Sequence, residues 1–169
     1  MRVRPAEPAD AAGIRAVHLA AFPTALEANL IEALEREGDA VVSLVAEGAG
    51  EVAGHVLLSR MRVEGGGRAY RALGLGPVAV KPGHQGAGIG AALIEGALAI
   101  ARATGEELVF LVGEPDYYCR FGFSAETAAA FASPFAGPYF MALALQPGTE
   151  LPAQGTAAYA RAFSDLPPG

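Results

Sequence analysis

The chain is poor in the residues on which several functional classes depend. Its single cysteine, Cys119, excludes an internal disulfide. Its three histidines lie far apart, and together with one cysteine they form no cluster of zinc-ligand spacing. Lysine and arginine number 12 against 18 acidic residues, and the net charge of −6 argues against nucleic-acid binding, which needs basic residues to neutralise phosphates. We therefore expect no metal and no nucleic-acid partner.

Long apolar runs are also missing. No run reaches the roughly 18 residues that cross a bilayer, so no membrane partner is expected. The opening residues, Met1 to Pro5, lead into acidic residues instead of the apolar core of a signal peptide. Together with the single cysteine, this predicts a reducing cytoplasm as the location. What the chain does contain is 52% hydrophobic residues in a length of 169, which is typical of about one packed domain.

The first half of the chain alternates strand and helix patterns. A short strand at 2–4 precedes a helix that Asp10 can cap and Pro23 ends. A second helix has capping-box spacing at Thr24 and Glu27 and ends at Gly38. The apolar residues predicted to face inward are Ile14, Val17 and Ala21 in the first helix and Leu26, Leu30, Ala33 and Leu34 in the second. Strands at 41–46 and 52–61 flank Gly48-Ala49-Gly50, which is a hairpin signal.

The second half predicts a strand, a helix and a parallel strand. The strand at 72–80 contains Pro77, which cannot donate to a sheet ladder and so indicates a bulge, a place where neighbouring strands stop pairing, or an edge strand. A helix follows from Ile89 to Gly105, with Ile89, Ala92, Leu93, Gly96 and Ile100 facing the sheet. The apolar strand at 108–112 is typical of a parallel partner buried on both faces. These elements predict an α/β core.

Between that strand and that helix lies a turn with three alternating glycines, Gly86, Gly88 and Gly90. Glycines at every second position let successive backbone N–H groups converge on one anion, because no Cβ blocks the approach. The helix that follows adds its unpaired N–H groups and its partial positive charge. The segment therefore predicts a cradle for a pyrophosphate.

A dinucleotide-binding fold would show the same order of elements. Residues 86–91 fit its G-x-G-x-x-A pattern, and Glu114 lies where an acid would bind a ribose hydroxyl. Against this, five residues separate the glycines from the strand, and no second nucleotide-binding half follows. A phosphate-loop nucleotidase is weaker, since no Lys-Ser or Lys-Thr pair follows the glycines. The glycines alone leave the choice open.

The segment at 113–123 adds a second motif. Gln85-x-x-Gly88-x-Gly90 followed by Tyr118-x-x-x-Gly122-Phe123 resembles the GNAT superfamily of N-acetyltransferases. The Gly-acid-Pro-x-Tyr-Tyr form at 113–118 is similar to its YhbS-like branch, as are 139–143 and Gly155-Thr156. The resemblance is strong from Leu73 to Phe123 and loose elsewhere.

This resemblance implies a mixed α/β fold, with a central, mostly antiparallel sheet that is splayed beside the strand ending at Val80 and flanked by helices. It implies transfer of acetyl from acetyl-coenzyme A directly to a primary amine of a small molecule or peptide, in a ternary complex. The main chain of Val78 and Val80 would pair with the pantetheine. The residues around the pyrophosphate would be Gln85, Gly86, Ala87, Gly88, Ile89 and Gly90.

Acetyl transfer to an amine also needs an acid for the leaving thiolate. In similar enzymes the tyrosine at the position of Tyr118 points to the coenzyme sulfur, which implies that Tyr118 is the general acid, whereas Tyr117 is expected to pack. Many relatives carry a glutamate on the strand before the turn, but this chain has no acid between Ala72 and Val80. Glu114, Asp116 or water would then take the proton, although Asp116 could instead cap the short helix that follows.

The remaining candidates have plainer explanations. Cys119 has no nearby histidine to activate it, and His55 and His84 are expected to be structural. The aromatic segments 22–24 and 131–139 could form a lid over the acceptor or cover a sheet edge. We expect one domain over residues 1–145 and a tail over 146–169 that adds a strand or contacts a second subunit, which leaves a homodimer open. The alternative functions are a non-catalytic acyl-coenzyme A binding module and an NAD-binding protein.

Overall fold

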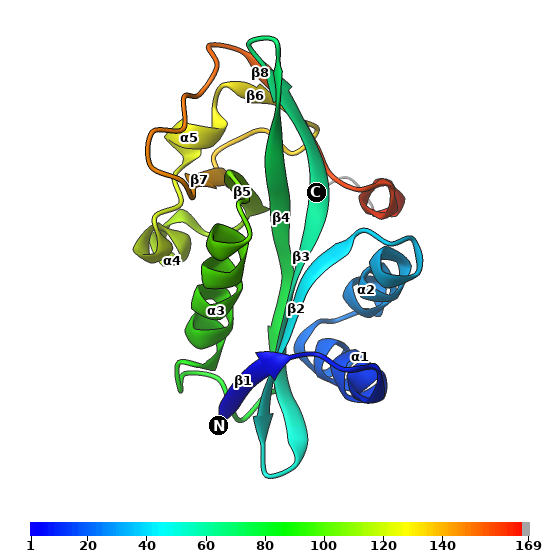
Figure 1. The fold of residues 1–169 in the computed structure, drawn as a ribbon. Helices are drawn as coiled ribbons and strands as arrows, with labels where there is room; N and C mark the ends of the chain where they lie inside the picture. The colour runs from blue at the N-terminus through cyan, green and yellow to red at the C-terminus, as the bar shows by residue number, and fades with distance from the viewer. Residues whose placement is uncertain (167–169) are drawn as a thin grey trace. The chain divides into compact units, whose positions relative to one another are not determined.

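The computed structural model describes residues 1–166 and is shown as a ribbon in Figure 1. This part of the chain divides into two compact units. The first unit comprises Met1–Leu58 and Gly76–Ile100, and the second comprises Ser59–Leu75 and the residues from Ala101 onward. Three elements, β3 (Glu51–Gly65), β4 (Arg68–Val80) and α3 (Ile89–Ala103), run from one unit into the other.

The first unit is a sheet with helices on both faces. β1 (Arg2–Pro5) pairs antiparallel with β2 (Ala40–Gly48), and the strand order continues through β3 to β4. Its other elements are η1 (Pro8–Asp10), α1 (Ala11–Ala21) and α2 (Leu26–Arg36). A Cβ added at Gly54 of β3 would meet Leu93 of α3, whereas His55 contacts His18 of α1. Since successive side chains of a strand alternate, α1 and α3 cover opposite faces.

The predicted start of α1 is right in position but wrong in its bonding. Asp10 occupies the N-cap position, yet its carboxylate makes no bond to the helix. It accepts hydrogen bonds from two Arg4 nitrogens at 2.8 and 3.0 Å and from the Glu7 N–H at 2.7 Å. These hydrogen bonds, first from Arg4 and then from Glu7, lower the pKa of Asp10 to about 2. Asp10 therefore ties the helix to β1.

The predicted apolar stripe of α2 is partly wrong. Leu30 and Leu34 are buried, but Leu26 is 40% exposed. Ala28 and Ile31 are buried in its place. Leu26 is the first residue of α2, and its N–H donates to Thr24 Oγ1 at 3.3 Å. The Leu26 side chain therefore lies at the start of the helix, before the face that packs on the sheet begins. The predicted end is right, because Gly38 has the left-handed φ of +79°.

The inward face of α3 is also shifted from the prediction. Ile89 and Leu93 are buried as expected, but Ala92 is exposed and Ile100 is 36% exposed. The buried set is Ile89, Leu93, Ile94, Ala97, Leu98 and Ala101. Apolar residues occupy both the predicted and the observed inward positions of α3, so the sequence pattern could not determine which of these two adjacent faces of the helix packs on the sheet.

The second unit contains both parallel and antiparallel strand pairs. β4 pairs parallel with β5 (Leu108–Val112), and β5 pairs antiparallel with β7 (Phe140–Ala144). β8 (Gly155–Ala158) pairs antiparallel with β3 and parallel with β6 (Phe131–Ala132). Its helices are α4 (Pro115–Tyr118), η2 (Cys119–Phe121), α5 (Ala125–Ala128) and η3 (Arg161–Asp165). The predicted mixed sheet flanked by helices is confirmed.

The pairing of β4 with β5 is short. The parallel register covers Ala72–Gly74 against Leu108–Phe110, although β4 continues through Gly76 and Pro77 to Val80. Gly76 has a φ of +132°, which L side chains rarely adopt. The end of this ladder just before Pro77 fits the prediction that two neighbouring strands stop pairing there.

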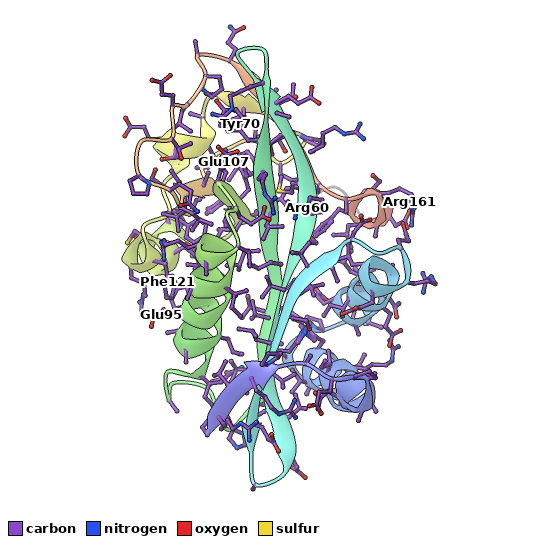
Figure 2. All side chains as sticks on the ribbon, viewed as in Figure 1. Arg60, Tyr70, Glu95, Glu107, Phe121 and Arg161 are labelled. Carbon is purple, nitrogen blue, oxygen red and sulfur yellow. The ribbon has the colours of Figure 1, made fainter. Side chains whose placement is uncertain are left out.

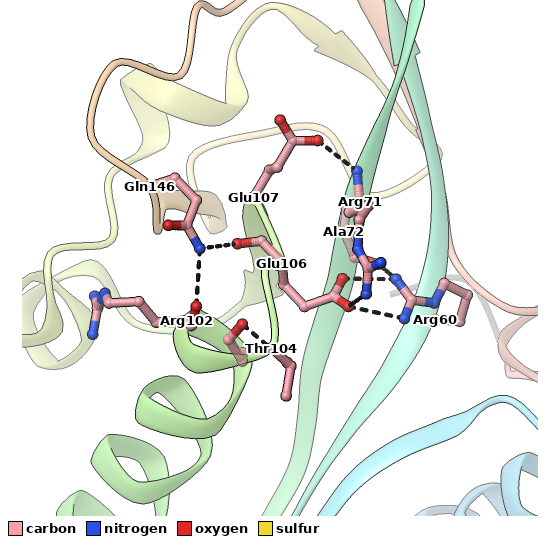
Figure 3. Close-up of polar contacts among 9 residues, drawn as sticks. Arg60, Arg71, Ala72, Arg102, Thr104, Glu106, Glu107 and Gln146 are labelled. Atoms are coloured by element: carbon pink, nitrogen blue, oxygen red, sulfur yellow. Dashed lines mark hydrogen bonds and ion pairs between the residues drawn. The ribbon is translucent and has the colours of Figure 1, made fainter.

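A buried carboxylate holds three strands of the second unit together (Figure 3). Glu106, 1% exposed, lies just before β5 and accepts hydrogen bonds from Arg60 of β3 at 2.7 and 3.0 Å and from Arg71 of β4 at 2.7 Å. Burial raises the pKa of Glu106, but the two guanidinium groups outweigh that effect and the net pKa is lowered. Glu106 is therefore a structural anion.

The tail adds a strand, β8, as one of the two predictions for 146–169 allowed, and its last three residues lie outside the described range. Within residues 1–166, no helix is both long enough and apolar enough to cross a bilayer.

Candidate functional site

The glycine turn of the first unit connects β4 to α3 in an exposed, left-handed conformation. Gly83, Gly86 and Gly88 have φ angles of +93°, +82° and +80°. Residues 82–88 are exposed, and no atom lies within 4 Å of a Cβ added at any of these three glycines. The space above the main chain is thus open to a ligand at Gly86 and Gly88, two of the three glycines where the sequence predicted a close approach, whereas the third, Gly90, lies in the first turn of α3.

Short main-chain bonds hold the two ends of this turn. Lys81 N donates to Ala53 O at 2.8 Å, and His84 N donates to Lys81 O at 3.0 Å. Gln85 Nε2 donates to Val80 O at 3.3 Å, so the predicted phosphate-binding glutamine closes the turn on itself. The turn is therefore held by one main-chain bond to β3, one main-chain bond within the turn and the side chain of Gln85.

α3 begins directly behind the glycines. Its first intrahelical bond runs from Ala92 N to Gly88 O at 3.0 Å. The N–H groups of Ile89, Gly90 and Ala91 precede that bond and have no carbonyl one turn earlier in the helix. A helix of 15 residues places its positive end at this point. The turn can bind a phosphate through backbone N–H groups alone.

The end of β4 offers main-chain groups of its own. Because Lys81 N bonds to β3, the N–H and C=O groups of Val78 and Val80 point away from β3, as alternate residues of a strand do. Val80 O accepts a side-chain hydrogen bond from Gln85 Nε2 at 3.3 Å. An extended ligand could pair with these groups as an additional strand.

Tyr118 is held in an aromatic cluster of the second unit. Its ring makes edge contacts with Tyr117 at 4.9 Å and with Phe123 at 6.2 Å between centroids, and it covers Gly113. Burial, and then the neighbouring Tyr117, raise the pKa of its hydroxyl. Tyr118 is thus protonated at neutral pH and can donate a proton.

The neighbours of Tyr118 are engaged in local packing. Arg120 donates to Tyr117 O at 2.9 Å and lies over the Tyr117 ring at 4.4 Å. Cys119 is exposed, and its Sγ lies 3.5 Å from Asp116 O. Phe121, labelled in Figure 2, makes an edge contact with Tyr117 at 5.5 Å. These contacts account for Tyr117 and Cys119 without a chemical role.

The two acidic candidates for the base are both exposed. Glu114 is the N-cap residue of α4, but its side chain makes no cap bond, and Asp116 lies inside the first turn. The expectation that Asp116 caps this helix is wrong, because Pro115 starts the helix one residue earlier. Within residues 1–166, neither carboxylate forms a hydrogen bond with Tyr118.

The aromatic segments expected to cover an acceptor differ in burial. Phe131 is 2% exposed and makes edge contacts with Phe110 at 5.2 Å and Tyr70 at 6.2 Å, so it belongs to the core of the second unit. Its role as a lid residue is therefore wrong. Tyr139, at 51% exposure, is free of that core. In the first unit, Phe22 ends α1 and stacks on His18 at 5.9 Å.

Sequence reasoning missed a chain of hydrogen bonds in the first unit. His18 Nε2 lies 2.9 Å from His55 Nδ1, and His55 Nε2 lies 2.8 Å from Ser43 Oγ. Both rings are fully buried. Burial lowers the pKa of His18 to about 4 and, with the adjacent His18, that of His55 to about 3. The expectation that His55 is structural agrees with this neutral pair, but nothing in the sequence paired it with His18.

A cavity of about 910 Å³ in the first unit contains none of the predicted site residues. Its walls include Ile14 and Arg15 of α1, Ile31 and Glu32 of α2, and Ser43 of β2. The cavity and the glycine turn are therefore separate features of the first unit: the cavity lies between α1, α2 and β2, whereas the turn is exposed and offers backbone N–H groups.

Comparison with known proteins identifies what the two motifs belong to. Residues 2–125 match the family described as "Acetyltransferase (GNAT) domain". The chain is 36% identical over 116 residues to "Uncharacterized N-acetyltransferase YjhQ" of Escherichia coli strain K12, a match that spans 68% of this chain and 64% of that protein, somewhat less than two thirds of its length. It is 33% identical over 124 residues to "Uncharacterized N-acetyltransferase YhbS" of the same strain, and that match spans 73% of each chain.

Two solved structures have the same fold. The crystal structure of YhbS from Escherichia coli in complex with CoA superposes with a TM-score of 0.86 at 27% identity, over 98% of this chain and 93% of that one. A GNAT family acetyltransferase from Brucella melitensis in complex with acetyl-CoA has a TM-score of 0.79 at 38% identity, over 96% and 97% of the two chains.

Proposed function

Because the chain belongs to the GNAT family of N-acetyltransferases, in its YhbS-like branch, we propose that it transfers an acetyl group from acetyl-coenzyme A directly to a primary amine in a ternary complex. The acceptor is a small molecule or a peptide. A single acetyltransferase domain over residues 1–145 with a tail over 146–169, and a location in the cytoplasm, belong to the same proposal, and a homodimer stays open within it.

The observation that carries this proposal is the geometry of the glycine turn. Three left-handed glycines, an open space above them and the start of a 15-residue helix suit a pyrophosphate. The two similar solved structures contain CoA and acetyl-CoA. In this chain the phosphates would lie against the backbone of Gln85, Gly86, Ala87, Gly88, Ile89 and Gly90, and Val78 and Val80 would pair with the pantetheine.

Tyr118 is proposed as the general acid. The bound coenzyme supplies a thioester, whose acyl carbon the neutral amine attacks. Tyr118 donates its phenolic proton to the departing sulfur, and its raised pKa keeps that proton available at neutral pH. The ammonium proton passes to water, Glu114 or Asp116. Glu114 and Asp116 are both exposed, which lets bulk water receive the proton.

A non-catalytic acyl-coenzyme A binding module is the second candidate. It is favoured by one feature, the lack of any acid between Ala72 and Val80, where many relatives carry a glutamate. It predicts binding of acetyl-coenzyme A without transfer to any amine.

Two measurements test the proposal. The first is the melting temperature with acetyl-coenzyme A, coenzyme A and NAD in parallel, since a ligand at 100 times its dissociation constant stabilises by about 2.7 kcal/mol. A shift with both coenzyme A forms and none with NAD is expected, and a shift with NAD alone would overturn the proposal. The second is acetyl transfer to a panel of amines by Tyr118→Phe, for which we expect kcat to fall about 100-fold or more. Unchanged kcat with chemistry rate-limiting would remove Tyr118 from its role.

A further inference from the structure

The outer edge of β2 is open at its first residues. β1 pairs with β2 only as far as Leu44, and one further bond runs from Ala6 N to Ser43 O at 2.9 Å before the chain turns into η1. β2 itself begins earlier, at Ala40, and Figure 1 shows it continuing past β1 toward α2. The sheet neighbours of β2 among the described strands are β1 and β3, so residues 40–42 have no strand on their outer side.

Val41 directs its main-chain polar groups to that open side. Ser43 O points toward β1, because it accepts from Ala6 N. Residues two apart on an antiparallel strand point their N–H and C=O groups to the same side, so those of Val41 lie past the end of β1. Val41 is also 42% exposed. Its N–H and C=O are therefore available to a further strand, as at an uncovered sheet edge.

A cavity lies directly beside this edge. The 910 Å³ cavity of the first unit is lined by residues 40–44 of β2, and its other walls come largely from α1 and α2. Ile14 and Ile31, 8% and 4% exposed, give these two helices an apolar surface there. Ile100 of α3, 36% exposed, lines the cavity as well. A cavity of this size accommodates a small ligand or a few side chains of a peptide.

Ser43 contributes a hydrogen-bond donor to the lining of this cavity. His18 Nδ1 is buried and has no partner within residues 1–166. A buried lone pair without a partner is tolerated more readily than a buried N–H, so neutral His18 carries its proton on Nε2. His18 Nε2 then donates to His55 Nδ1, and His55 Nε2 donates to Ser43 Oγ. Because Ser43 Oγ accepts from His55, its own hydrogen is left for a ligand.

The charged side chains around the cavity favour a basic ligand over an acidic one. Three glutamates and two arginines line it: Glu7, Glu32, Glu35, Arg15 and Arg36. Arg15 Nη1 lies 3.0 Å from Glu32 Oε1 in an ion pair, which leaves two carboxylates and one guanidinium. Lysine side chains on a bound strand could reach these carboxylates, whereas an acidic strand would be repelled by them.

We propose that the open edge of β2 and the cavity beside it bind an extended peptide that carries apolar and basic side chains. The peptide adds a strand beside Val41 and exchanges main-chain hydrogen bonds with it. Alternate side chains of that strand enter the cavity, where Ile14 and Ile31 contact an apolar one and Ser43 donates to an acceptor. This surface is separate from the glycine turn, and the inference does not depend on acetyl transfer.

A capped pentapeptide, acetyl-Lys-Leu-Val-Gln-Lys-amide, tests the inference. Its leucine and glutamine lie on one face of an extended strand and its valine on the other. Fluorescence anisotropy of the labelled peptide should show saturable binding with a Kd of about 10⁻⁴ M or lower. The same peptide with glutamate in place of both lysines should bind about tenfold more weakly.

N-methylation of the peptide tests the added strand directly. Adjacent residues of a strand direct their N–H groups to opposite sides, so a methyl group on the leucine nitrogen and one on the valine nitrogen should differ in effect. One of the two peptides should lose at least about tenfold in affinity, and the other should stay within about threefold of the parent. Equal affinities of the two methylated peptides would overturn the strand.

Ala11→Phe and Ala12→Phe form a matched pair of protein variants. Both alanines are exposed residues at the start of α1, but only Ala11 is among the residues that line the cavity. Ala11→Phe should fill the cavity mouth and weaken peptide binding at least about tenfold, whereas Ala12→Phe should leave it unchanged. Neither should lower the melting temperature, as is usual for surface substitutions. Equal binding by both variants would overturn the inference.

Ser43 has its own test. Ser43→Ala should weaken binding of the glutamine peptide about fivefold, the effect of one neutral hydrogen bond, and should not weaken binding of the peptide with leucine in place of glutamine. Ser43→Thr, which keeps a hydroxyl, should bind both peptides as the unaltered protein does. A loss that is the same for both peptides would remove Ser43 from this role.

The other possible occupant of the edge is a second copy of the chain. Sedimentation of the protein without peptide decides between the two, and we expect no dimer that Ala11→Phe dissociates. Such a dimer, together with no saturable peptide binding, would assign the edge to a second copy and overturn the inference. Absence of both the dimer and peptide binding would overturn it as well.

Discussion

The two units bury their polar groups in opposite ways. The first unit encloses His18 and His55 as a neutral pair, bonded to each other at 2.9 Å. The second unit encloses Glu106 as an anion and brings two arginines to it at 2.7 Å each. Histidine can lose its charge on burial at neutral pH, because its ordinary pKa is near 6.5, but a carboxylate would need a pKa above 7 to do so.

This difference shows that the stability of the first unit depends on pH, whereas that of the second unit depends on the ion pairs that Glu106 forms with two arginines. A neutral buried pair needs no counter-charge but becomes costly as soon as solution conditions protonate it. An anion with two guanidinium groups tolerates a wide pH range but loses its stabilisation when either side of the ion pair is removed.

Acidification should produce the largest effect, and it should act through the first unit. The unfolded chain binds protons at its histidines near pH 6.5, whereas folded His18 and His55 resist protonation until about pH 4 and 3. The unfolded state thus binds more protons between these values, so the free energy of unfolding falls as the pH falls. At pH 5 the loss is about 2 kcal/mol for each histidine relative to pH 7. Urea unfolding at the two pH values measures it.

Two variants sharpen this prediction. His55→Gln should roughly halve the dependence on pH, and His84→Asn should leave it unchanged, since His84 is exposed. Equal stability of the unaltered protein at pH 7 and pH 5 would show that the pair is not buried neutral.

Removal of the charge at Glu106 should produce the next largest effect. Glu106→Gln keeps the shape of the side chain but leaves Arg60 and Arg71 without their anion, and we expect the free energy of unfolding to fall by about 2 kcal/mol at pH 7. Glu95→Gln, a change at an exposed position of α3 labelled in Figure 2, is the matched control and should fall within 0.5 kcal/mol of the parent, roughly the spread of surface substitutions. Similar denaturant midpoints for both variants would contradict the anchoring role of Glu106.

A pair of glycines, one in each unit, allows a smaller and more selective test. Gly88 and Gly105 have nearly the same φ, +80° and +85°, and neither has an atom near an added Cβ. Alanine at either position should cost about 1–2 kcal/mol of backbone strain. We expect only Gly88→Ala to weaken acetyl-coenzyme A binding, about tenfold by titration calorimetry, because binding must restore the left-handed turn. Equal affinities of Gly88→Ala and Gly105→Ala for acetyl-coenzyme A would show that the glycine turn does not bind the coenzyme.

Cys119→Ser should have the smallest effect. The thiol is exposed and makes one weak contact, with Asp116 O at 3.5 Å. We expect stability to change by less than about 0.5 kcal/mol and the transfer rate to stay within about twofold. A large loss of rate would instead favour a covalent acyl-enzyme on this residue.

Local signals predicted the elements and the two motifs. The hairpin at Gly48–Gly50, the helix end at Gly38 and the parallel strand at 108–112 were all correct, because turn glycines and apolar runs act over a few residues. The phase of α2 and α3 was less accurate. An apolar side chain such as Leu26 or Ile100 satisfies a helical pattern whether or not a neighbouring element covers it.

The candidate site, like the fold, has features that depend on neighbouring residues and features that depend on contacts between distant segments. The left-handed turn at Gly86 and Gly88 before α3 could be predicted, since the conformation of such glycines depends on local chain geometry alone. The position of the Tyr159 ring over Gly74 could not be, because these residues are far apart in the sequence and β8, which Tyr159 follows, reaches this part of the sheet through its pairing with β3. The same holds for His18 with His55, which the packing of α1 on β3 brings together.

The order of residues was thus sufficient to determine the family, the glycine turn and the motif around Tyr118, because each is encoded by neighbours in the chain. Which polar groups are buried, which of them pair and which carry a charge was decided by the tertiary structure. Burial and pairing depend on surfaces supplied by segments that are far apart in the sequence. The order of residues along the chain does not by itself say which of these segments will come into contact.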